Sequence, residues 1–162
     1  MGHYADSVAS ETSFAERNLD PAQFRSGYWT SWYELIGAAN VVLHYTDQIN
    51  VSQERKNFYK GQGHFYRAIA YWRLVQTWGD CVIIGDDAKL ETAFPKSSWS
   101  EVLDYTINEV RQAVALLPEY DKIQDSQGNV PEYKNVPCKG AANALLAHLC
   151  AMKAGWKWFA RP

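Results

Sequence analysis

The sequence predicts an all-α fold of stacked helical hairpins joined by long loops. Three observations lead to this prediction. Apolar side chains recur at steps of three and four residues in four separate stretches, which is the period of an amphipathic helix. Capping and stop signals bound these stretches. The two longest connections are rich in glycine, proline and polar residues, as loops are. Two helical pairs stacked side by side would bury all four apolar stripes.

The first 28 residues show no sustained period, so the first helix is expected near residues 29–47. Its apolar side chains share one face. They are Trp32, Leu35, Ile36, Ala39, Val42 and Leu43.

The second helix is expected near residues 52–78 and contains Gly61 and Gly63. Each glycine costs about 1 kcal/mol relative to alanine in a helix interior. We therefore expect both to allow a neighbouring helix to come close. Gly79 is placed where a left-handed backbone ends a helix, and the short run 81–84 that follows reads as extended.

The third helix is expected near residues 98–117, because Ser98 and Glu101 form a capping box and Pro118 stops the pattern. The fourth is expected near residues 138–157, where small residues allow tight helix packing. Cys81 and Cys150 lie among apolar residues and read as small buried side chains.

Composition and charge exclude several classes of function. The net charge of −2 comes without a basic stripe, so nucleic acid is not a favoured partner. No run of about 18 apolar residues is present, so no transmembrane helix is expected. Three cysteines without a C-x-x-C motif and four scattered histidines do not form a metal site. No cofactor is expected, and no nucleophile–base pair or phosphate-binding loop indicates an enzyme.

Four segments, taken in chain order, form a family pattern. The most specific runs from Gly61-Gln-Gly-His-Phe-Tyr-Arg67 to Trp78-Gly79-Asp80. The others are Trp32-Tyr-Glu-Leu-Ile36-Gly-Ala-Ala-Asn40, Ser98-Trp-Ser-Glu101 through to Leu117-Pro118, and Lys139-Gly-Ala-Ala-Asn-Ala-Leu-Leu-Ala147. Together they resemble the SusD/RagB family of nutrient-binding outer-membrane lipoproteins over roughly residues 29–157. The chain departs from the family pattern at Gln62, where glutamate is usual, and at Val136-Pro137-Cys138.

The resemblance implies a tetratricopeptide-like N-terminal domain over residues 1–162, with the C-terminal domain of the family absent. It implies glycan (oligosaccharide) binding at the outer surface of the cell outer membrane, together with a TonB-dependent transporter. Membrane attachment would require a lipid anchor that is missing from this chain. One alternative is a helical protein-interaction scaffold whose ligand site lies in the missing part. Another is a relative that binds peptides.

The matched segments contain candidate structural residues. We expect Arg67 and Asp80 to act as a charge pair or cap that fixes the helix end and the loop after it. Trp78 and Gly79 belong to the same helix end. Asn40 is expected to hydrogen-bond neighbouring backbone.

Candidate ligand-binding residues come from the aromatic content, which is 14% with seven Trp and ten Tyr. Such rings either pack between helices or stand exposed as stacking platforms. Sugars need flat aromatic faces together with planar polar groups. Tyr28, Trp29 and Arg25 meet this description near the start of the first helix, so they are the predicted ligand-binding residues.

Overall fold

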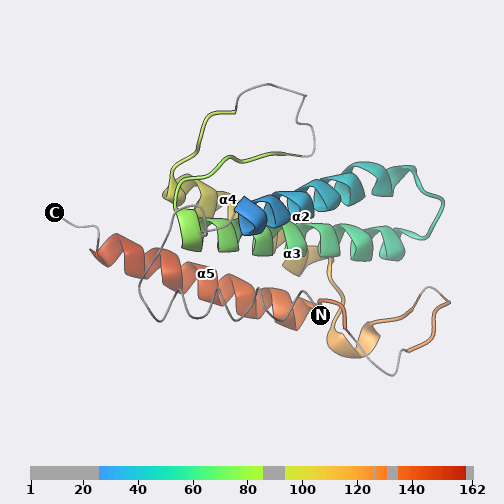
Figure 1. The fold of residues 1–162 in the computed structure, drawn as a ribbon. Helices are drawn as coiled ribbons and strands as arrows, with labels where there is room; N and C mark the ends of the chain where they lie inside the picture. The colour runs from blue at the N-terminus through green and yellow to red at the C-terminus, as the bar shows by residue number, and fades with distance from the viewer. Residues whose placement is uncertain (1–25, 86–93, 126, 131–134, 160–162) are drawn as a thin grey trace, which may run out of the picture. The chain divides into compact units, whose positions relative to one another are not determined.

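The computed structural model describes residues 26–85, 94–125, 127–130 and 135–159. Within these ranges the fold is all-α, as predicted, with four main helices (Figure 1). They are α2 (Ser26–Tyr45), α3 (Gln53–Trp78), α4 (Trp99–Leu116) and α5 (Lys139–Phe159), with short 3-10 helices η1 (Thr46–Gln48) and η2 (Tyr120–Lys122). The first helix begins three residues before its predicted start, and the bounds of α3, α4 and α5 agree with the predicted ones to within two residues.

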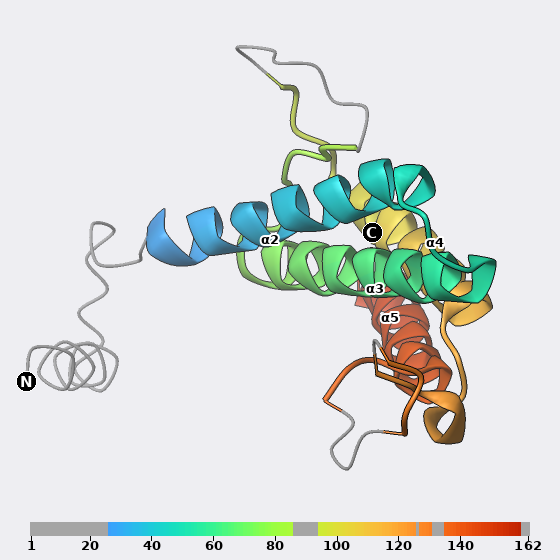
Figure 2. The ribbon, with the colours of Figure 1, turned by 90° about the vertical axis from the view of Figure 1, so that its right-hand side faces the viewer.

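The chain divides into two compact units, residues 1–31 and residues 32–162. The described part of the first unit is the beginning of α2. In the second unit, α3 packs against α4 and α4 packs against α5. Successive helices run in opposite directions, as Figures 1 and 2 show. This alternation is the hairpin stacking that the sequence predicts.

Two glycines of α3 let its neighbours approach closely. A Cβ atom on Gly61 would lie 2.9 Å from the side chain of Leu117 at the end of α4. A Cβ atom on Gly63 would lie 3.1 Å from the side chain of Leu43 in α2. Both contacts are tighter than a real Cβ tolerates without movement of its neighbour. The two glycines therefore serve the helix packing that was predicted for them.

The apolar core lies along the inner faces of the helices. Its largest fully buried side chains include Tyr71, Ile36, Leu74, Leu103 and Leu149. Full burial of one such side chain stabilises the fold by about 1.5–3 kcal/mol. None of the described helices is long and apolar enough to cross a membrane.

Two predictions about single core residues were wrong. Cys81 is buried as predicted, but Cys150 is exposed, because α5 turns it away from the α4-facing side that buries Leu145 and Leu149. Val42 is 38% exposed although it neighbours the buried Leu43. Adjacent residues on a helix point in different directions, so only one of the two can face the core.

Capping residues define the start of α4 and the end of α3. Ser98 and Glu101 form the predicted capping box at the start of α4. Hydrogen bonds from the Ser98 hydroxyl and backbone N–H lower the pKa of the Glu101 carboxyl. Gly79 adopts a φ of +73° and donates its N–H to the carbonyl of Val75, which ends α3. This is the left-handed position predicted for Gly79.

Candidate functional site

A charged pair lies inside the helical core of the second unit. Arg67 of α3 donates from Nε and Nη2 to the two carboxylate oxygens of Glu109 of α4, over 2.7 and 2.9 Å. Arg67 is 3% exposed and Glu109 is 6% exposed. The second partner of Glu109 is His64, whose Nδ1 lies 2.9 Å from Oε2. The Arg67 guanidinium also stands over the Tyr105 ring, 5.8 Å from its centroid.

The contacts with Arg67 and His64 keep the Glu109 carboxylate ionised. Burial alone would raise the pKa of this carboxyl, but hydrogen bonds from His64 and Arg67 outweigh burial and hold the pKa below its usual value. A bidentate, fully paired carboxylate of this kind stays charged in a low-dielectric interior. Glu109 is therefore a structural counter-ion for Arg67.

Asn40 extends this network to the chain that follows α3. Its side-chain oxygen accepts from Nη1 of Arg67 over 2.8 Å. Its side-chain nitrogen donates to the carbonyls of Gly85 over 3.0 Å and of Ile84 over 3.3 Å. The prediction that Asn40 would hydrogen-bond neighbouring backbone is confirmed.

Two tyrosine hydroxyls hold the extended segment 81–85. The hydroxyl of Tyr33 accepts from the N–H of Val82 and donates to its carbonyl, both over 2.9 Å. The hydroxyl of Tyr71 accepts from the N–H of Ile84 over 2.7 Å and donates to the carbonyl of Ile84 over 3.2 Å. Burial raises the pKa of both phenols, so each keeps the proton that it donates. The segment is thus hydrogen-bonded like a strand by side chains from α2 and α3.

The start of α4 is tied to the same segment. Cys81 and Ser97 form an antiparallel bridge with backbone bonds of 3.2 and 2.9 Å. The carboxylate of Asp80 accepts from the N–H of Trp99 over 2.8 Å. Asp80 therefore caps the start of α4, whereas the predicted cap was at the end of α3. Among the ion pairs of the described residues, Glu109 is the partner of Arg67. Glu109 was not predicted, because a charged residue of an amphipathic helix is expected to face solvent. The structure instead buries it together with its neighbours Thr106 and Val110.

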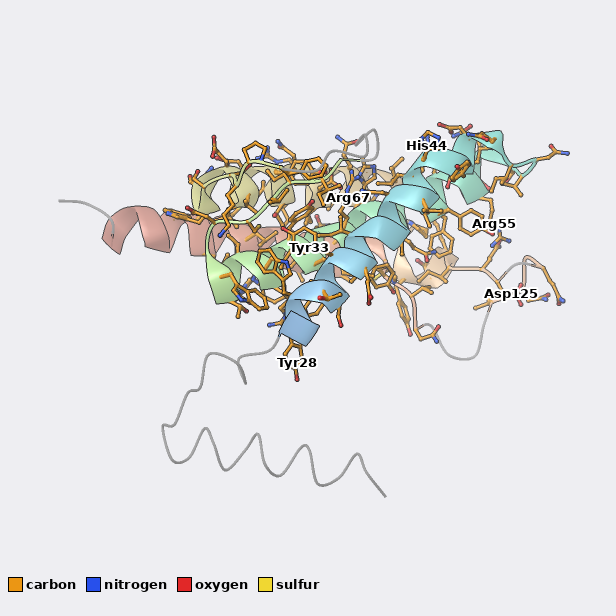
Figure 3. All side chains as sticks on the ribbon, turned by 45° about the horizontal axis from the view of Figure 1, so that its top comes forward. Tyr28, Tyr33, His44, Arg55, Arg67 and Asp125 are labelled. Atoms are coloured by element: carbon orange, nitrogen blue, oxygen red, sulfur yellow. The ribbon has the colours of Figure 1, made fainter. Side chains whose placement is uncertain are left out.

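The predicted ligand residues lie at the start of α2, in the first unit. Tyr28 is 68% exposed, and Figure 3 shows its ring pointing away from the helix. Trp29 is half-buried. The two rings do not form one platform, because consecutive residues on a helix point about 100° apart. Arg25 lies outside the described residues.

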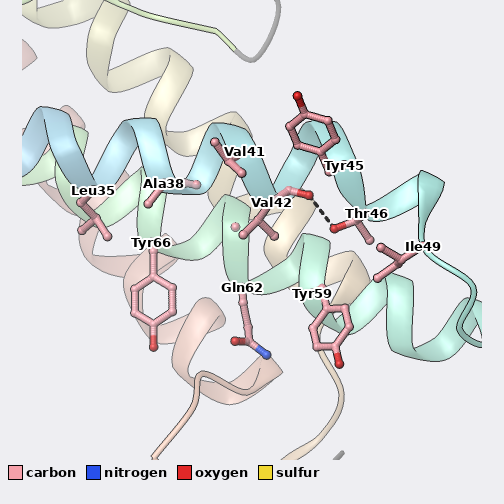
Figure 4. A pocket seen from close by; sticks show the side chains of 12 residues that line it. Leu35, Ala38, Val41, Val42, Tyr45, Thr46, Ile49, Tyr59, Gln62 and Tyr66 are labelled. Carbon is pink, nitrogen blue, oxygen red and sulfur yellow. Dashed lines mark hydrogen bonds between the residues drawn. The ribbon is translucent and has the colours of Figure 1, made fainter.

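An apolar groove, which the sequence did not predict, lies between α2 and α3. It has a volume of about 470 Å³. Val41 and Tyr45 of α2 are 57% and 53% exposed on its rim. On the α3 side, Tyr59 and Tyr66 flank the groove in Figure 4 with Gln62 between them. Exposed apolar surface of this kind is typical of a contact with another protein.

Comparison with known proteins assigns the family. A SusD-like family model, described as starch-binding and associating with the outer membrane, matches residues 3–150. A SusD-like protein of Bacteroides ovatus is 26% identical over 159 residues. That alignment covers 95% of this chain and 26% of the relative, so the chain spans about a quarter of the relative's length.

Solved structures share the fold. A laminarin-binding SusD-like protein superposes with a TM-score of 0.73 and 22% identity, over 85% of this chain and 28% of that one. A structure solved with xylogluco-oligosaccharide gives a TM-score of 0.61 and 26% identity, over 76% of this chain and 23% of that one. The family match spans most of the chain, and the folds agree. The chain belongs to the SusD-like family, which is described as starch-binding and associating with the outer membrane.

Proposed function

We propose that this chain takes part in capturing oligosaccharides for an outer-membrane nutrient-uptake system, at the cell surface and next to a TonB-dependent transporter. The observation that carries the proposal is the exposed ring of Tyr28 in a chain that belongs to a carbohydrate-binding family. An exposed tyrosine offers a flat face for the C–H face of a sugar and a hydroxyl for hydrogen bonding. Trp29 and Arg25 are proposed as further ligand contacts, with the Trp29 ring offering a face separate from that of Tyr28.

Affinity electrophoresis against a panel of plant, host and starch polysaccharides tests this proposal and identifies the glycan. We expect at least one polysaccharide to retard the wild-type chain. Tyr28→Ala should reduce the retardation. Tyr45→Ala is the matched control, because it removes an exposed tyrosine from the same helix in the apolar groove. Equal loss in the two variants would show that Tyr28 has no specific role.

The groove favours a second function, docking on a protein partner, for which the transporter is the proposed candidate. Its lining is almost entirely apolar, so a sugar bound there would leave most hydroxyls without partners. A protein surface would instead bury Val41 and Tyr45 without that cost.

This second function is tested by measuring how the purified transporter binds the chain. The double variant Val41→Ser/Tyr45→Ala should weaken this binding, and Tyr28→Ala should leave it unchanged. Unaltered binding of the double variant would contradict docking through the groove.

A further inference from the structure

A second pocket, of about 520 Å³, lies at the end of the α3–α4 pair where α3 begins and α4 ends. It is formed where the first turns of α3 meet the chain that leaves α4. Its volume falls within the range of small-ligand sites, which is about 300–1,000 Å³. All of its lining residues belong to the second unit and to the described part of the chain.

The wall of this pocket is fixed by side-chain bonds. The guanidinium of Arg55 donates to the carbonyls of Gln124 and Asp125, which fastens the connection to α3 (Figure 3). Ile123, between the pocket and the core, is 1% exposed. The carboxylate of Asp125 accepts from the N–H groups of Gln127 and Asn129 over 2.8 and 2.9 Å. A wall built in this way needs little ordering when a ligand binds.

The lining combines apolar and polar groups. The ring of Phe58 together with Leu116 and Pro118 supplies apolar surface for the C–H face of a sugar ring. The polar lining consists of Ser52, Glu54, Arg55, Asn57, Asp121, Lys122 and Gln124. These side chains provide both donors and acceptors, which a ligand rich in hydroxyl groups requires.

The charges of the lining cancel. Glu54 and Asp121 are negative, and Arg55 and Lys122 are positive. A pocket without a net charge does not select an anion or a cation, so its chemistry fits an uncharged ligand. The α2–α3 groove differs on this point, because its lining offers few polar partners to a sugar.

We propose that this pocket is an oligosaccharide subsite that binds a short stretch of a neutral glycan. The inference rests on the proposed carbohydrate-binding function and adds a second contact, made by residues of the second unit. Asp121, Asn57 and Gln124 bind sugar hydroxyls, and Phe58 packs on a ring face.

The experiment is a titration of the isotope-labelled 162-residue chain, followed by NMR amide shifts. The probes are laminarihexaose and a xylogluco-oligosaccharide, both neutral, and an acidic oligogalacturonate. We expect a neutral probe to shift amides of residues 52–58 and 116–124. Binding should change little with added salt, since the ligand is uncharged.

Variants locate the contact. Asp121→Ala removes an exposed acceptor and should weaken neutral-probe binding at these amides about tenfold, as expected for a hydrogen bond to a charged group. Phe58→Leu keeps an apolar side chain and removes the flat ring, so it should weaken binding as well. Gln112→Ala, an exposed change on α4 outside the pocket, is the control.

The possible outcomes separate the two proposals. Shifts confined to the region of Tyr28 would overturn the subsite and keep the proposed function. Shifts in the pocket without shifts in the region of Tyr28 would support the subsite and show that Tyr28 has no part in the binding. Stronger binding of the acidic probe would overturn the assignment to neutral glycans. Binding of no probe in either region would overturn both.

Discussion

Arg67 and Glu109 place opposite charges in the interior of a small helical unit, where an unpaired charge is costly. Three hydrogen bonds reach the Glu109 carboxylate, two from Arg67 and one from His64. Asn40 accepts from the remaining side of the guanidinium. The family motif around Arg67 is therefore explained by packing of the fold, with no ligand required.

Removing one partner of this pair should destabilise the chain strongly. Arg67→Met leaves Glu109 buried without its counter-ion, so the free energy of unfolding should fall by about 3–5 kcal/mol. Urea denaturation measures the change. Arg111→Met, which alters an exposed arginine of α4, should change it by less than about 0.5 kcal/mol. The double variant Arg67→Met/Glu109→Leu should recover part of the loss. A cost below about 1 kcal/mol for Arg67→Met would show that the pair does not hold the core.

The lowered pKa of Glu109 also predicts a dependence of stability on pH. A carboxyl whose pKa is lower in the folded state stabilises the fold at pH values above its unfolded pKa of 4.5. This contribution is lost as the pH falls through the folded-state pKa. The unfolding free energy of the wild type should therefore decrease as pH falls below about 4.5. Glu109→Gln should show a shallower decrease over the same range. Parallel pH profiles for the two proteins would contradict this role.

At the scale of single elements, α3 shows how far sequence reasoning reaches. Its glycines were predicted to allow close packing, and Gly61 and Gly63 each meet a leucine of a neighbouring helix. Its end at Gly79 was predicted because glycine adopts a left-handed backbone most easily, and Gly79 has a φ of +73°. These features depend on local rules that one sequence contains.

Other features depend on contacts between distant residues. The hydrogen bonds of the Tyr33 and Tyr71 hydroxyls to segment 81–85 join residues up to 49 positions apart in the sequence. No local sequence pattern predicts them. Glu109 reads as a solvent-facing residue until the facing Arg67 is known. The two pockets likewise arise where separate elements meet. Sequence reasoning therefore predicted the scaffold and one exposed ring, and missed both concave surfaces.

The glycine contacts give a paired prediction. Gly61→Ala should destabilise the chain by about 1–3 kcal/mol, because the added methyl group would overlap the Leu117 side chain. Gly37→Ala adds the same group to α2 with no atom within 4 Å, so it should stabilise the chain by about 0.5–1 kcal/mol. Thermal unfolding measures both. Equal effects of the two substitutions would mean that the α3–α4 contact is looser than described.

The tyrosine clamp gives a further prediction for segment 81–85. Tyr71→Phe removes the only partner of the Ile84 N–H among the hydrogen bonds of the described residues. An unsatisfied N–H that is fully buried costs about 1–3 kcal/mol, and Ile84 is half-buried, so the free energy of unfolding should fall by no more than that. Hydrogen exchange of the Ile84 amide should accelerate. Tyr45→Phe, which removes an exposed hydroxyl, is the control. Unchanged exchange at Ile84 in Tyr71→Phe would contradict the clamp.

On the scale of the whole molecule, the residues that define the family and those proposed to bind ligand are largely separate. The family motifs build a helical scaffold with a fixed segment at residues 81–85. The side chains proposed to make the contacts lie outside these motifs: Tyr28, Val41 and Tyr45 in α2, and Asn57, Phe58, Asp121 and Gln124 in the pocket at the start of α3. Motif residues line part of the groove and part of the pocket. This separation is consistent with a family whose members share a fold and differ in the glycan they bind.

Calorimetric titration of the wild-type chain with the glycan found by electrophoresis shows whether the chain itself binds an oligosaccharide. We expect saturable binding that weakens about tenfold in Tyr28→Ala and persists in Tyr45→Ala. A wild-type chain that is folded by circular dichroism and releases no heat of binding with any glycan of the panel would contradict this expectation.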